Sequence, residues 1–213
     1  MKAPRDLRSA LSHVRWIGGG SGAAKSTVAR TLAARHRATL YDTDAAMPDH
    51  TARLDPERCP RLAAFVEMGL DDRWVHRSPR EMLKSFHWFA GEGFEAIIDD
   101  LLGLPRDRAV IAEGFRLLPD HVAPHLVERR QAVWLLPTPA FRRRAFDARG
   151  TTWDIPNRTG DPPRALANLM DRDALFTERL EQETTMLGLS SMRVDGTRSK
   201  VALIRAVDDR LFG

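Results

Sequence analysis

The segment from residue 14 to residue 30, VRWIGGGSGAAKSTVAR, constrains the fold of this chain more than any other. An apolar run ends at three consecutive glycines, and a helical pattern then opens at Lys25 with Val28 and Leu32 on one face. Strand, glycine-rich loop and helix in this order form the context of a phosphate-binding loop. Successive backbone N–H groups then face one concavity, and the helix N-terminus adds positive partial charge. The segment therefore predicts an anion-binding loop after a first strand.

The loop matches the Walker A pattern G-x-x-x-x-G-K-[ST] except that Ala24 replaces the final glycine. Alanine is strained there if the backbone needs a positive φ. In such loops Lys25 would reach the β- and γ-phosphates of a nucleotide, and Ser26 would ligate Mg²⁺. The alternative is a glycine-rich turn without a ligand. We expect the loop residues to hold the nucleotide: Gly19, Gly20, Ser21, Gly22, Ala23, Ala24, Lys25, Ser26 and Thr27.

Composition narrows the class of protein. The 213 residues are 43% hydrophobic and 29% charged, which is typical of a folded globular chain. The lone Cys59 excludes an internal disulfide and fits a reducing compartment. No leader-like or membrane-spanning apolar run is present in the sequence, so we expect a cytoplasmic protein without membrane contact. The net charge is +4, but only residues 142–144 form a tight basic cluster, which argues against a nucleic-acid partner.

Five short apolar segments, separated by helical patterns, predict an α/β fold with a five-stranded parallel sheet. The strand pattern is interrupted between residues 45 and 105, where helical spacing predicts an insertion between strands 2 and 3. We expect this insertion to bind the acceptor, that is, the small molecule that would receive a phosphoryl group. We divide the chain into an N-terminal extension (1–12) and a single domain (13–213), which contains this insertion (45–105) and a lid (141–163). The five segments are 14–17, 39–41, 108–112, 132–136 and 192–195.

Carboxylates follow two of these strands. Asp42 and Asp44 come directly after strand 2, and Glu113 follows strand 3, which we expect beside strand 1. Parallel sheets place ligand groups at the carboxyl ends of strands, so all three should face the phosphates. Asp44 would contact the acceptor or cap the next helix. Glu113 would bind the acceptor or, with Ser26, a hydrated Mg²⁺. Arg116 would bind the acceptor or pair with Glu113.

Arginines gather in the segment 141–163. Arg142 and Arg149 lie seven residues apart, at the same face of a predicted helix over 141–148. Arg158 lies in the polar loop 150–160, and a long helix capped by Asp161 follows. Helix, loop and helix predict a lid whose arginines cover the transferring phosphoryl group. The alternative is a solvated basic face.

In this order of elements the chain resembles the P-loop kinases of nucleotides and small metabolites. That group includes shikimate kinase, gluconokinase, chloramphenicol phosphotransferase and the nucleoside monophosphate kinases. The resemblance is specific at residues 18–27 and at Asp42-Thr43-Asp44, which is similar to the Asp-Ser/Thr-Asp of shikimate kinase. Over the rest of residues 13–212 it concerns only the order of strands and helices. It implies a three-layer P-loop NTPase fold, an acceptor-contacting base at Asp44 or Asp42, and lid arginines on the phosphates, Arg149 first, then Arg142 and Arg158.

The sequence thus predicts a kinase that uses ATP, or alternatively GTP, with Mg²⁺ to phosphorylate a hydroxyl of a small molecule. Its catalytic residues would be Lys25, Asp44, Asp42 and Arg149. Arginines of the insertion (73, 77 and 80) keep a nucleoside monophosphate kinase as the second interpretation. The alanine in the loop favours a third, a nucleotide-binding module without catalysis. A kinase of nucleic-acid ends would need a contiguous basic groove. The sequence is compatible with a monomer and with a homodimer.

Overall fold

The computed structural model describes residues 4–148 and 154–213. Within these residues, five strands form one sheet in the order β2-β3-β1-β4-β5, and every neighbouring pair is parallel. The predicted α/β fold with a five-stranded parallel sheet is confirmed. The strands are β1 (Val14–Gly19), β2 (Thr39–Asp42), β3 (Val110–Glu113), β4 (Ala132–Pro137) and β5 (Ser190–Val194).

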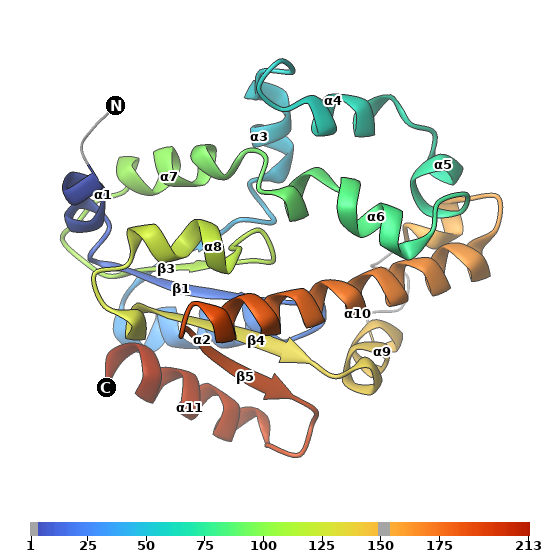
Figure 1. Cartoon of the computed structure of the whole chain (residues 1–213). Helices are drawn as coiled ribbons and strands as arrows, with labels where there is room; N and C mark the ends of the chain where they lie inside the picture. The colour runs from blue at the N-terminus through green and yellow to red at the C-terminus, as the bar shows by residue number, and fades with distance from the viewer. Residues whose placement is uncertain (1–3, 149–153) are drawn as a thin grey trace.

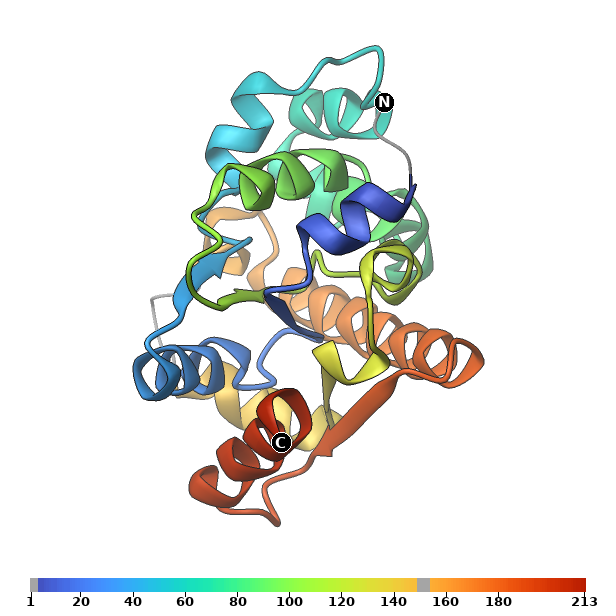
Figure 2. The same cartoon turned by 90° about the vertical axis from the view of Figure 1, so that its left-hand side faces the viewer.

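Helices cover both faces of the sheet (Figures 1 and 2). Alternate residues of a strand point to opposite faces. On β1, Trp16 therefore packs into one core and Ile17 into the other, and Trp134 and Leu135 repeat this on β4. One layer contains α2 (Lys25–His36) and α11 (Lys200–Phe212); the other contains α1 (Pro4–Ala10), α7 (Phe94–Gly103), α8 (Pro119–Val122) and α10 (Pro162–Met186).

The strand order brings the predicted site residues to one edge of the sheet. As expected, β3 lies beside β1, with Glu113 opposite Ile17. The same Glu113 lies opposite Asp42 of β2. The carboxyl ends of β1, β2 and β3 therefore meet where the glycine-rich loop leaves the sheet.

A run of short helices separates β2 from β3 and lies over the upper side of the molecule in Figure 1. The helix α6 (Pro79–Ser85) of this run begins with a reciprocal capping box between Ser78 and Glu81. The alternative that Asp44 caps the next helix is wrong, since the first helix of this run has Ala46 at its N-cap and no side-chain cap. The elements before α7 are α3 (Met47–Arg53), α4 (Pro60–Glu67), α5 (Leu70–Trp74), α6 (Pro79–Ser85) and the 3₁₀ turn η1 (His87–Ala90).

The segment expected as a lid is described in part. Helix α9 (Pro139–Asp147) is capped by Thr138, and α10 by Asp161, whose carboxylate accepts from the backbone N–H of Arg164. Between them lies the 3₁₀ turn η5 (Pro156–Arg158), and Gly160 N–H donates to Asp71 Oδ1 of α5 at 2.7 Å. This segment therefore contacts the insertion.

Boundaries and connections differ from the sequence prediction in places. Strand β3 begins two residues late and includes Glu113, and β5 begins two residues early. Residues 115–131 contain three short helical elements where no element was predicted: α8, η2 (Ala123–His125) and η3 (Arg129–Gln131). Of the helices described here, none has both the length and the hydropathy to cross a bilayer.

Candidate active site

The loop between β1 and α2 has an unusual backbone. Gly19 has φ +129°, and a Cβ there would lie 2.1 Å from the carbonyl oxygen of Leu135, so only glycine fits. Ala24 has φ +64°, the left-handed region that glycine occupies freely. The position therefore does need a positive φ, and alanine holds it at a cost of about 1–2 kcal/mol.

Lys25 lies over this loop. Its Nζ donates to the carbonyl oxygen of Gly20 at 3.0 Å, and the residue is 7% exposed. Residues 21–27 together with Asp44 form a hollow of about 110 Å³. The N-terminus of α2 opens there and has no side-chain cap, so its backbone dipoles favour an anion. The expected loop residues from Ser21 to Thr27 thus share one concavity.

The two aspartates after β2 have different partners. Asp42 Oδ1 accepts from the N–H groups of Asp44 (2.9 Å) and Ala45 (3.0 Å), which fixes the turn. The Asp44 carboxylate accepts from the Thr43 hydroxyl at 3.3 Å and from the N–H of Phe115. Burial raises the pKa of Asp44, and the charge of Lys25 opposes this. Asp44 and the loop lysine therefore lie close enough for their charges to interact.

Glu113 and Ser26, predicted as metal ligands, are brought together. The Ser26 hydroxyl hydrogen-bonds to the Glu113 carboxylate, which is 1% exposed. Burial raises the pKa of Glu113, with Ser26 and Lys25 opposing the shift. Its Oε2 has no partner among the described residues, which leaves one oxygen for a ligand. The described residues contain no three-residue metal cluster, but Mg²⁺ needs only one or two protein oxygens beside phosphates and water.

Gly114 allows the ends of β2 and β3 to approach this closely. Its φ is +148°, and a Cβ at this position would lie 1.8 Å from the Thr43 hydroxyl oxygen. Any side chain would push the Asp44 turn away from Glu113.

Arg116 does not pair with Glu113 in the hydrogen bonds of the described residues. Its Nη1 donates to the carbonyl oxygen of Thr43 (3.2 Å) and to His50 Nδ1 (2.8 Å), and Nη2 donates to the carbonyl oxygen of Gly93 (3.2 Å). The guanidinium stacks on Trp88 at 3.9 Å, and burial lowers its pKa to about 10. Arg116 thus joins the Asp44 turn to the insertion.

The partners of His50 extend this network. Because Arg116 can only donate, Nδ1 of His50 accepts, and Nε2–H donates to Asp100 Oδ2 at 2.8 Å. Tyr41 also donates to Asp100, at 2.6 Å. The network connects β2, α3 and α7 beneath the turn that carries Asp44.

A larger cavity of about 550 Å³ lies next to the loop hollow. Ser21 and Asp44 line both, so the two spaces meet at these residues. The remaining walls come from the insertion, from the segment after β3, from residue 155 and from the first half of α10: Met47, Thr51, Leu62, Phe65, Val66, Arg73, Trp74, Phe86, His87, Trp88, Phe89, Phe115, Ile155, Leu169, Arg172 and Asp173.

Arg172 and Asp173 are cavity residues that sequence reasoning missed. Both are buried, and they are paired through Arg172 Nη2 and Asp173 Oδ1 at 2.7 Å. The sequence does contain a signal for them, because both residues fall between Leu169 and Phe176 on the buried stripe of α10. Charged residues on an apolar stripe indicate a polar site in the core.

The predicted lid arginines occupy different places. Arg142 is fully buried on α9, and its Nε donates to the carbonyl oxygen of Ser21 at 3.3 Å. It lines a third hollow, of about 390 Å³, rather than the space inside the loop. Arg158 is exposed in η5, and Arg149 lies outside the described residues.

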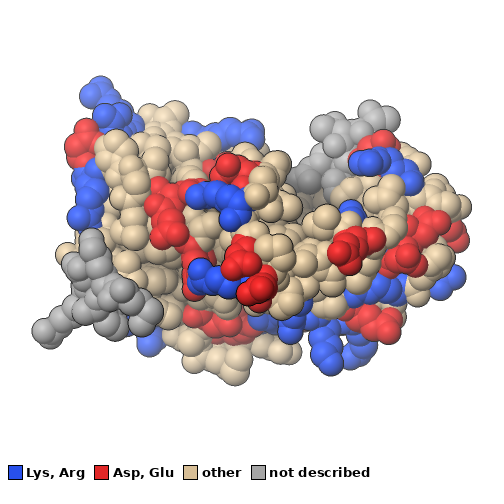
Figure 3. Space-filling view, turned by 90° about the horizontal axis from the view of Figure 1, so that it is seen from above, with Lys and Arg blue, Asp and Glu red and all other residues tan. Residues whose placement is uncertain are grey.

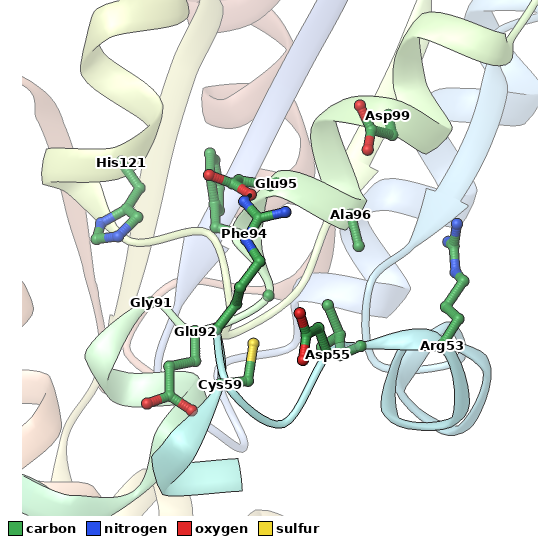
Figure 4. Close-up of a pocket in the computed structure, with 13 residues that line it drawn as sticks. Arg53, Asp55, Cys59, Gly91, Glu92, Phe94, Glu95, Ala96, Asp99 and His121 are labelled. Carbon is green, nitrogen blue, oxygen red and sulfur yellow. Dashed lines mark hydrogen bonds and ion pairs between the residues drawn. The ribbon is translucent and has the colours of Figure 1, made fainter. Parts of the chain in front are cut away.

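A further polar hollow, of about 410 Å³, lies between α3, α4 and α7 (Figure 4). Its acidic groups serve neighbouring structure: Glu92 accepts from the N–H groups of Arg61 and Leu62 at the start of α4, and Glu95 pairs with Arg58. Burial raises the pKa of the Cys59 thiol, so it is a poor nucleophile. We therefore place the candidate site at the loop and the aromatic cavity.

No family model and no curated protein matches this sequence. The features of the structure that point to a function are the glycine-rich loop, the carboxylates after β2 and β3, and the cavity that meets the loop at Asp44.

Proposed function

We propose that the protein is an ATP- and Mg²⁺-dependent phosphotransferase that moves the γ-phosphoryl group to a hydroxyl of a small molecule. The observation that supports this best is the position of Asp44. Asp44 lines both the hollow of the glycine-rich loop and the 550 Å³ cavity, so one carboxylate residue would serve a phosphate site and an acceptor site.

In this proposal the loop N–H groups and Lys25 bind the phosphates, and Ser26 and Glu113 hold the hydrated Mg²⁺. When bound, Mg²⁺ neutralises charge on the phosphate oxygens. The acceptor oxygen forms a bond to the γ-phosphorus while the bond to the bridging oxygen breaks, and ADP leaves with that electron pair. Asp44 takes the hydroxyl proton, and its raised pKa makes it a stronger base than an exposed aspartate.

One observation favours a second function, nucleotide binding without transfer. Ala24 holds a left-handed backbone at the position where the Walker A pattern has glycine. A strained loop binds phosphate less readily if the strain increases on binding.

A nucleoside monophosphate kinase and a kinase of nucleic-acid ends have less support. Of the insertion arginines, Arg73 lines the cavity, whereas Arg77 donates to the carbonyl oxygen of Glu81 and Arg80 is exposed. A kinase of nucleic-acid ends needs a basic surface, but acidic and basic side chains are interspersed on the face in Figure 3.

Calorimetric titration with ATP·Mg²⁺ and GTP·Mg²⁺ tests the proposal. Lys25→Ala should weaken nucleotide binding at least about tenfold, because it removes the only side-chain cation of the loop. Lys84→Ala, on the exposed face of α6, is the matched control and should bind as the wild type does. Absence of nucleotide binding, or an unaffected Lys25→Ala variant, would contradict the proposal. Binding without acceptor-dependent ADP release would favour the non-transferring module.

A further inference from the structure

The cavity beside Asp44 has mostly apolar walls, and aromatic rings are the largest group among the side chains that line it. Most of these rings pack edge to face, as Phe86 and Phe89 do with ring centroids 4.8 Å apart at 80°, whereas Phe86 and Phe115 are stacked. Such packing fixes the rings in place. A polyol or a sugar acid would leave most of its polar groups unpaired against these walls, which disfavours binding. Six rings line the cavity: Phe65, Trp74, Phe86, Trp88, Phe89 and Phe115.

Two polar atoms among these rings lack a partner. Arg172 is 7% exposed, and its Nε and Nη2 donate to Asp173, whereas Nη1 has no hydrogen-bond partner among the described residues. The same is true of His87 Nδ1. The Cζ atom of Arg172 lies 5.1 Å from the ring centroids of both Phe86 and Phe89. Nη1 is therefore an unsatisfied donor enclosed among the aromatic walls, which an oxygen of a bound ligand would satisfy.

The charges of the cavity balance. Arg172 is paired with Asp173, and the two other charged residues of the lining, Arg73 and Asp44, carry opposite formal charges. Burial lowers the pKa of His87 to about 3, so its ring is neutral at pH 7. A phosphate dianion would enter a desolvated space without excess positive charge, which is unfavourable. An uncharged ligand leaves the balance intact.

We propose that the acceptor is an uncharged aromatic alcohol. Its ring packs among the six aromatic side chains, an ether or carbonyl oxygen accepts from Arg172 Nη1, and a short arm brings its hydroxyl to Asp44. This inference rests on the phosphotransferase function proposed above. The volume of about 550 Å³ lies inside the range of about 300–1,000 Å³ that holds small-molecule ligands.

Ligand-observed NMR without nucleotide tests the class of ligand directly. The probe is 2-phenoxyethanol, which has the ring, the ether oxygen and the hydroxyl arm. Phenoxyacetate keeps its skeleton but adds a charge, 2-(cyclohexyloxy)ethanol removes the aromatic ring, and AMP and xylitol represent the nucleotide and polyol classes. We expect 2-phenoxyethanol to bind at least about tenfold more tightly than each of these.

A rim substitution locates the binding. Val66 is 54% exposed and lines the cavity, so Val66→Trp should leave the fold intact and reduce binding of 2-phenoxyethanol at least about tenfold. Val201→Trp is the matched control, because Val201 is also exposed but lies on α11. Tighter binding of AMP or xylitol, or a Val66→Trp variant that binds the probe as the wild type does, would overturn the inference.

The two proposals fail differently. Titration with ATP·Mg²⁺ reports on the loop, and Val66→Trp should leave it unchanged. Nucleotide binding with a cavity that prefers AMP or xylitol overturns the acceptor class and leaves the phosphotransferase standing. A cavity that binds 2-phenoxyethanol in a protein without nucleotide binding overturns the phosphotransferase, and with it the acceptor role of the ligand.

Discussion

Arg142 Nε donates to the carbonyl oxygen of Ser21 at 3.3 Å, which links α9 to the glycine-rich loop. Its Nη2 donates to the Thr177 hydroxyl of α10, and Nη1 has no partner among the described residues. We expect Arg142→Met, which keeps the length and removes the charge, to weaken ATP·Mg²⁺ binding by about tenfold, because the loop loses this contact. Calorimetric titration measures the effect.

Arg143 provides the control for this prediction. It is the next residue on α9 and is exposed, so Arg143→Met should change neither stability nor nucleotide affinity. Equal affinities of the two variants would show that the contact with Ser21 does not order the loop for phosphate.

Ala24→Gly should stabilise the protein and strengthen nucleotide binding. Glycine adopts φ +64° without strain, so we expect the free energy of unfolding to rise by about 1 kcal/mol. Arg37→Gly separates the two effects, because Arg37 also has a positive φ, +51°, at the other end of α2. Chemical denaturation should show a gain for both variants, and titration a gain in nucleotide affinity for Ala24→Gly alone. A loss of affinity in Ala24→Gly would contradict the strain argument.

The sheet and the loop could be predicted because their signals are local. The apolar run of β1, the glycines after it and the periodicity of α2 lie within one segment, and buried parallel strands read as apolar runs. The meeting of Asp42 and Glu113 followed from strand order, since carboxyl ends of parallel strands share an edge.

The cavity and the role of Arg116 could not be predicted in this way. Trp74 and Trp88 lie on a five-residue helix and a 3₁₀ turn, which are too short to show a periodic pattern. Arg116 finds His50 and Gly93 across 66 and 23 residues of sequence. Such partners depend on how the short helices of the insertion fold over the sheet.

Asp44 should give the reaction a dependence on pH. As a base it acts only when ionised, and burial raises its pKa above the ordinary 3.8, so the transfer rate should fall as pH drops through this raised value. Asp44→Asn should reduce kcat by about 10²–10⁴-fold and remove this limb of the profile. A pH–rate profile of both proteins with a confirmed acceptor checks this, with Asp49→Asn, at an exposed position of α3, as the control.

Asp44→Asn, which should lower kcat, should raise the free energy of unfolding at neutral pH. A carboxyl whose folded pKa is raised stabilises the fold fully below its unfolded pKa, and this contribution is lost as pH rises through the folded pKa. Asp44→Asn should therefore be more stable than the wild type at pH 7, and the difference should shrink toward pH 4. A variant that loses stability at pH 7 would show that the ionised carboxylate stabilises the turn instead.

Substitution of Arg116 tests whether this buried arginine stabilises the fold or binds the acceptor. Its three hydrogen bonds hold the Thr43 and Gly93 carbonyls and His50, so Arg116→Met leaves buried acceptors unsatisfied. We expect the free energy of unfolding to fall by about 3 kcal/mol or more. Arg116→Lys should recover only part of this, because an ammonium cannot reproduce the planar fork.

Denaturation of both variants, beside Arg108→Met at an exposed position, measures the loss. In the proposed phosphotransferase, Arg116 would act on catalysis through the Asp44 turn, so kcat should fall in Arg116→Met while KM for ATP stays near the wild-type value. An Arg116→Met protein of wild-type stability that no longer binds the acceptor would instead support the acceptor contact expected from the sequence.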